Sequence, residues 1–145
     1  MRAALACLTC LAFAGPVQAW TFSETDICRV THSAAEMEVD LTFDPATAVY
    51  TITVTRPAAK WADDQNFRLQ FDGPRPLIIG TDRHTLSDDR RSVSVSDTGF
   101  GNVLDGIALN DSMTALAGGE AVSLSTTDAE AAITAFRACP SAPLS

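Results

Sequence analysis

The segment from Thr81 to Asp89 holds the densest collection of reactive residue types in the chain, including a histidine, an arginine, three serine or threonine hydroxyls and three aspartates. A Ser-His-Asp hydrolase needs these groups to converge from separate elements on an oxyanion hole, and the chain has no GxSxG nucleophile motif. We therefore assign no catalytic residue, although a small hydrolase using Ser87 or His84 remains an alternative. We expect the polar side chains to shape a loop and a turn, and we name as a candidate binding loop Asp82, Arg83, His84, Asp88, Asp89 and Trp61.

Trp61 has two interpretations. Aromatic side chains are common anchors of recognition surfaces, and they also fill cores at the margin of a sheet. The sequence leaves both roles open.

Residues that could hold a metal or a cofactor are sparse. His32 and His84 are the only histidines, and the acidic pairs at 63–64 and 88–89 do not follow the spacing of a calcium loop. The segment Gly99-Phe100-Gly101 lacks the third glycine of a dinucleotide fingerprint. We expect no metal and no cofactor, glycines with positive φ in a tight turn, and Phe100 beneath a helix.

Residues 1–19 have the order of a secretion signal, with a positive start, an apolar run over 3–14 and small residues before Trp20. We expect cleavage between Ala19 and Trp20. The apolar run is shorter than the roughly 20 residues that cross a bilayer, and a lipoprotein would need a cysteine at the cut. The expected product is one soluble domain over residues 20–145, in the periplasm or secreted.

The mature chain is acidic. Removing Arg2 leaves nine basic residues against eighteen acidic ones, and the arginines form no stripe. Duplex binding depends on basic side chains that release counterions from phosphates. We expect no nucleic-acid partner and no membrane insertion of the mature chain.

Two cysteines remain after cleavage, Cys28 and Cys139. A pair in an oxidising compartment predicts a disulfide bond between the first strand and the last helix. The alternative is a redox or metal-binding pair, but the chain contains no CxxC motif.

Alternating apolar and polar residues predict strands separated by short turns. We expect about six or seven, in a β-rich α+β fold that is an antiparallel sandwich or a partly open barrel. The expected strands span residues 28–32, 37–43, 49–55, 67–71, 77–80, 91–97 and 121–125.

Two segments predict helices. The first lies near residues 102–116, where Gly106 and Asn110 weaken the pattern and suggest a short helix and a turn. The second is a C-terminal helix that begins with a capping box from Thr127 to Glu130 and ends before Pro140.

The chain resembles a group of small exported alphaproteobacterial proteins of unknown function. The resemblance rests on Trp20, Cys28 and the segments 71–73, 81–84, 97–106 and 135–139. Some of these proteins are named as parts of the excinuclease ABC system, and a short acidic chain without a phosphate-binding loop does not support that name. The layout of strands and helix is also distantly similar to invasion-associated locus B proteins, from which the cysteine pattern departs.

Export, a disulfide and the lack of a catalytic motif favour a non-catalytic domain that binds a protein or an envelope component. The alternatives are an inhibitor of an extracytoplasmic enzyme, acting through residues 81–90, and the small hydrolase.

Overall fold

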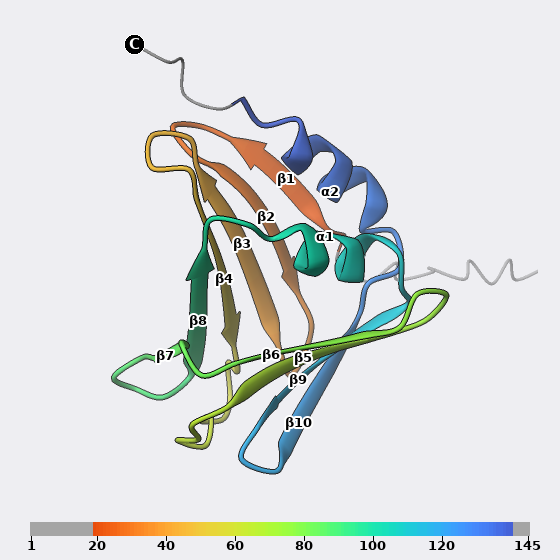
Figure 1. The fold of residues 1–145 in the computed structure, drawn as a ribbon. Helices are drawn as coiled ribbons and strands as arrows, with labels where there is room; N and C mark the ends of the chain where they lie inside the picture. Colours follow the sequence, from red (N-terminus) through yellow and green to blue (C-terminus); the bar gives the residue numbers. More distant parts are fainter. Residues whose placement is uncertain (1–18, 141–145) are drawn as a thin grey trace, which may run out of the picture.

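The computed structural model describes residues 19–140 and places ten strands in two antiparallel sheets, with two short helices (Figure 1). The six-stranded sheet has the order β1-β2-β3-β4-β8-β7, with bounds Thr21–Glu24, Cys28–Ser33, Glu38–Asp44, Val49–Thr55, Ser92–Asp97 and Thr85–Leu86. The four-stranded sheet has the order β10-β9-β5-β6, with bounds Glu120–Ser125, Ser112–Ala117, Phe67–Asp72 and Leu77–Thr81. The helices are α1 (Gly101–Ala108) and α2 (Glu130–Arg137). The expected β-rich fold with a C-terminal helix is confirmed, and the sheets do not close into a barrel.

All seven strands that alternation indicated are present, because a period of two places every second side chain on the buried face. In β3 and β4, Val39 pairs with Val54 and Leu41 pairs with Ile52. These four side chains are at most 2% exposed, and the residues between them face outward. The inner faces of both sheets and both helices contribute to one buried cluster.

The structure adds three strands that the sequence pattern did not show. β1 pairs only with β2, and β7 is two residues long and pairs only with β8. β9 replaces the second half of the helix expected near residues 102–116, so that part of the helix prediction is wrong. Met113, Ala115 and Ala117 point into the core, and β9 lies between β5 and β10.

Asn110 separates α1 from β9. Its side-chain N–H donates to the carbonyl of Gly106 (3.0 Å), and its side-chain oxygen accepts from the backbone N–H of Arg75 (3.0 Å). The buried amide therefore ends the helix and binds the turn that follows β5.

Gly106 allows α1 to lie directly on the core. A Cβ atom at this position would stand 2.4 Å from the ring of Phe71, which is too close for any larger residue. The glycine that weakens the helix in sequence terms is thus required by packing. Phe100 lies buried at the start of α1, as expected, but Gly99 and Gly101 do not take positive φ, so that prediction is wrong.

The capping box expected at α2 does not form. The helix begins one residue after Ala129, no side chain caps it, and Asp128 takes a left-handed φ of 66°. The backbone N–H of Ala129 instead donates to the carbonyl of Thr126, and Ala129 is buried. Burial of Ala129, Ala132, Ile133 and Phe136 on one face has decided where the helix starts.

The two sulfur atoms of Cys28 and Cys139 are at bonding distance, which joins the start of β2 to the chain just beyond α2. Trp20 lies beside this region, stacked on His32 with ring centroids 4.6 Å apart. Within residues 19–140, no helix has the length and apolar character needed to cross a bilayer. Residues 1–18 of the expected signal lie outside the described part of the chain.

Candidate functional site

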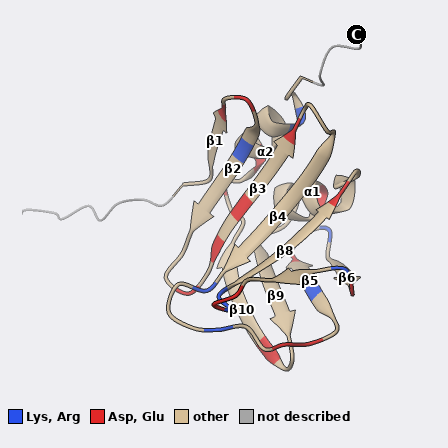
Figure 2. Cartoon of the chain, turned by 90° about the vertical axis from the view of Figure 1, so that its left-hand side faces the viewer, with Lys and Arg blue, Asp and Glu red and all other residues tan. Residues whose placement is uncertain are grey.

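Loops from both sheets converge at one end of the sandwich. We call this the loop end and define it as residues 56–66, 82–91 and 118–120. Figure 2 shows charged residues of both signs gathered in these loops, below β4 and β8. The candidate binding loop from the sequence lies in this region.

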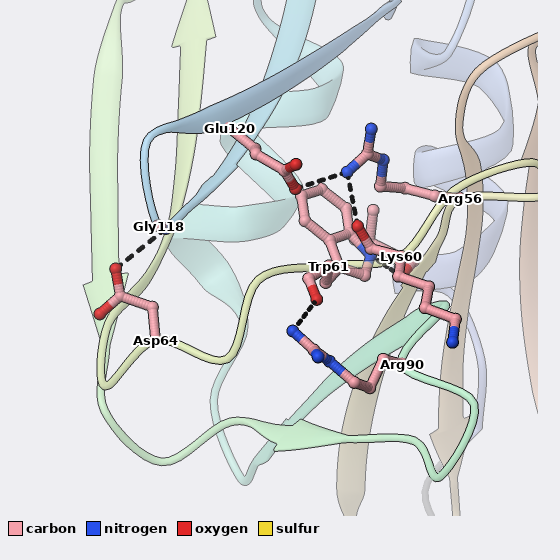
Figure 3. Close-up of polar contacts among 8 residues, drawn as sticks. Arg56, Lys60, Trp61, Asp64, Arg90, Gly118 and Glu120 are labelled. Atoms are coloured by element: carbon pink, nitrogen blue, oxygen red, sulfur yellow. Dashed lines mark hydrogen bonds and ion pairs between the residues drawn. The ribbon is translucent and has the colours of Figure 1, made fainter.

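Arg56 joins the connection between β4 and β5 to the other sheet (Figure 3). Its guanidinium donates to the carbonyl of Lys60 (2.8 Å) and forms an ion pair with Glu120 of β10 (2.6 Å). It also lies 5.2 Å from the ring centre of Trp61, in a cation–π contact. One side chain therefore holds the loop, the hairpin of β9 and β10, and the buried indole together.

Trp61 is part of the core and is not a surface anchor. Its side chain is 0% exposed, and its indole N–H donates to the carbonyl of Val54 (3.2 Å). Its backbone N–H donates to the carbonyl of Arg90 (2.6 Å), and its carbonyl accepts from the Arg90 guanidinium (3.0 Å). A buried ring cannot contact a partner, so of the two interpretations the core role is correct and Trp61 leaves the candidate binding loop.

Asp64 fastens the same connection to the turn between β9 and β10. Its carboxylate accepts from the backbone N–H of Gly118 (2.9 Å) and from that of Asn66 (3.1 Å). The hydrogen bond from Asn66 is the main cause that lowers the pKa of Asp64, and the one from Gly118 adds to it. Gly118 has a φ of 58°, and a Cβ atom there would meet that of Ala62 at 2.5 Å.

Arg83 and Asp89 shape the second loop of the site, as expected. The Arg83 guanidinium pairs with Asp97 at 3.3 Å. Asp89 accepts from the hydroxyl of Ser87 (2.7 Å) and from the backbone N–H of Arg91 (3.0 Å), which forms the turn between β7 and β8. The hydrogen bond from Arg91 is the main cause that lowers the pKa of Asp89.

The other three members of the candidate loop do not hold it in shape through ion pairs. Asp82 and Asp88 take part in no ion pair among residues 19–140. The His84 ring lies 5.9 Å from that of Phe67, and its buried Nδ1 has no hydrogen-bond partner. The expectation that Asp82 and His84 shape the loop therefore finds no contact to support it.

The arrangement does not have the geometry of a hydrolase site. The Ser87 hydroxyl donates to Asp89 and accepts from the backbone N–H of Ser92 (3.0 Å), so it is not paired with a histidine base. Within the described chain, no three metal-ligating side chains gather in a way that could hold an ion.

Two open depressions lie side by side at the loop end. One has a volume of about 610 Å³ and is lined by polar residues of β5, β6 and the β9–β10 turn, including Asp64, Asp82 and Glu120. The other, of about 630 Å³, is lined by Asp63, Asp64, Asp82 and His84 among others. They share Asp64 and Asp82, so carboxylates from two loops meet on one surface. The sequence had shown Asp63 and Asp64 only as a pair without calcium-loop spacing, and it carried no signal for Glu120.

Comparisons of the chain with protein-family models, with curated proteins and with solved structures found no match. The resemblance to small exported proteins therefore stays a prediction.

Proposed function

We propose that this protein is a non-catalytic domain of the periplasm or the extracellular space, and that its loop end binds another protein or an envelope component. The observation that carries the proposal is the joining of these loops to both sheets. Arg56, Trp61, Asp64 and Arg90 each bond a loop to a neighbouring strand or turn. Loops already ordered before binding lose little conformational entropy when a partner docks.

The chemistry of the surface favours a partner with positive charge. Asp63 and Asp82 line the depressions and form no ion pair with any residue that the structure describes. The nearby cations Arg56 and Arg90 are bonded to Glu120 or to backbone carbonyls. Acceptor oxygens are thus in excess, and they suit the ammonium or guanidinium groups of a partner.

The proposed location is supported by the disulfide. A bond between Cys28 and Cys139 persists where thiols are oxidised, which is the condition outside the cytoplasm. An acidic chain would also be steered toward basic partners and away from nucleic acid.

The test is affinity capture from envelope extracts with the chain from Trp20 onward. We compare the wild type with Asp63→Asn/Asp82→Asn and with the charge-matched control Glu24→Gln/Asp26→Asn, whose changes lie around the β1–β2 turn, at the other end of the sheet. We expect one component to bind the wild type and the control saturably, to bind the first variant at least about tenfold more weakly, and to be released by salt. A component held equally by all three chains, or none held saturably, would contradict the proposal.

A second candidate function is inhibition of an extracytoplasmic enzyme. The turn between β7 and β8 projects from the sandwich in Figure 1, and hydrogen bonds of Ser87, Asp89 and Arg91 fix its shape. Rigid projecting loops of this kind can fill an enzyme cleft. Titration of periplasmic proteases and lysozymes with the mature chain tests this candidate, and activity unchanged at saturating protein would remove it.

A further inference from the structure

The margin between the two sheets is open along β6 and β8. β6 is the edge strand of the four-stranded sheet. On the other sheet, β7 pairs only with Val93 and Ser94 of β8, so the segment from Val95 to Asp97 has no strand beyond it. Backbone hydrogen bonds therefore do not seal this side of the sandwich.

An apolar cavity of about 130 Å³ lies at this margin. Its walls come from both sheets and from the start of α1, with Phe67, Leu69, Ile79, Val95, Phe100 and Val103 among the lining residues. A protein cavity of about 150 Å³ with aliphatic and aromatic walls stays dry and accepts a molecule of the size of benzene. This cavity therefore has the size and lining for one six-carbon apolar group.

Arg83 and Asp97 stand at the rim of the cavity. Both oxygens of Asp97 are occupied, one by the Arg83 guanidinium (3.3 Å) and one by the backbone N–H of Thr98 (2.7 Å). The Arg83 side chain is 78% exposed, and among residues 19–140 its guanidinium has this one partner. A guanidinium carries several N–H donors, so the rim offers donors and no free carboxylate.

We propose that this cavity binds a small carboxylic acid whose apolar body, about the size of one benzene ring, fills the space between the sheets. The carboxylate of the ligand accepts hydrogen bonds from the free donors of Arg83. This site is separate from the carboxylate-lined depressions of the loop end, and it does not depend on the function proposed for them.

Phenylacetate is the probe, because it joins one ring to one carboxylate. It is titrated into the disulfide-bonded chain, and backbone amide shifts are followed by NMR. We expect saturable shifts at residues 79–83, 95–100 and 103. We also expect affinity at least about tenfold higher than for the neutral analogue phenylacetamide, since a hydrogen bond to a charged acceptor is the stronger one. Phenylacetate that gives no saturable shifts, or shifts elsewhere in the protein, would overturn the proposal.

Two kinds of variant separate the cavity from its rim. Val103→Leu fills the space from α1, and Val95→Leu fills it from β8, so at least one folded variant should lose phenylacetate binding while its melting temperature stays near that of the wild type. Arg83→Gln should lower phenylacetate affinity to that of phenylacetamide, whereas Arg75→Gln, a control at an exposed arginine outside the cavity, should leave it unchanged. Equal affinity in Arg83→Gln and Arg75→Gln, or binding that survives both cavity-filling changes, would refute the site.

Discussion

At the scale of single residues, Trp61 shows how one side chain can set the shape of a loop that faces solvent. The ring is fully buried against Phe67 in an edge-to-face contact, while its N–H, its backbone and the overlying Arg56 bind three neighbouring segments. Large aromatic rings with one polar atom suit such positions, because they fill space and still donate one hydrogen bond.

Replacing Trp61 with Phe should destabilise the fold. The change removes the donor to the Val54 carbonyl and leaves space beside Phe67, so we expect a loss of about 1–3 kcal/mol in the free energy of unfolding. Urea denaturation measures the loss. Tyr50→Phe is the control, because its ring packs between Phe43 and Phe100 and the change keeps the ring, so we expect a loss below about 0.5 kcal/mol. Equal losses in the two variants would show that the indole N–H has no special role.

Asp64 should make one end of the structure sensitive to acid. Its pKa in the folded protein lies below the ordinary value of 3.8, mainly because the Asn66 N–H favours the charged form. The contribution to stability is therefore complete above the unfolded pKa and is lost as the pH falls through the folded one. Amide exchange at Gly118 and Asn66 should be faster in Asp64→Ala than in the wild type at neutral pH. The two proteins should become similar in strong acid, and a difference that persists there would contradict this account.

At the scale of elements, the central pairing of the six-stranded sheet is reinforced on its outer face. Three threonines of β4 face three serines of β8, with hydroxyl oxygens 2.7 to 2.9 Å apart, and the pairs are Thr51–Ser96, Thr53–Ser94 and Thr55–Ser92. Cross-strand hydroxyl pairs stabilise a chosen register. They keep β8, which arrives after a long excursion through the other sheet, aligned with β4.

The β9–β10 turn offers a matched pair of glycine substitutions. Gly118 and Gly119 both have positive φ, of 58° and 79°. A Cβ at Gly118 would also strike Ala62, whereas one at Gly119 would meet nothing within 4 Å. We expect Gly119→Ala to cost about 1–2 kcal/mol of stability through backbone strain alone. Gly118→Ala should cost more and should also perturb the amide signals of residues 62–66. Equal costs by thermal denaturation would show that the loop does not press on the turn.

At the scale of the whole molecule, the disulfide closes a loop of 111 residues and ties β2 to the segment after α2. Both sheets lie within that loop, so the bond restricts the unfolded chain as a whole. This is the condition under which a disulfide has its largest entropic effect.

Replacing both cysteines with alanine should lower the free energy of unfolding by about 2–5 kcal/mol. Denaturation with and without reductant gives the comparison. Reductant should destabilise the wild type to the same extent and have no effect on the variant. A wild type that is insensitive to reductant after complete thiol reduction, verified by mass, would contradict the prediction.

The amino-acid sequence by itself determined the strands whose signal is local. In β3, β4 and β5, apolar and polar residues alternate because neighbouring side chains of a strand point to opposite faces, and that pattern can be read without knowing any partner. The turn from Ser87 to Arg91 and the helical character of α2 depend equally on residues close in the chain.

Only the tertiary structure decided features that depend on contacts between distant residues. β9 is a strand because β5 and β10 flank it, although its residues also suit a helix. Trp61 is buried because loops from both sheets cover it, and Glu120 belongs to the loop end because Arg56 reaches it from 64 positions away. Pairing and burial at such separations arise only when the chain has folded, so no local pattern could have announced them.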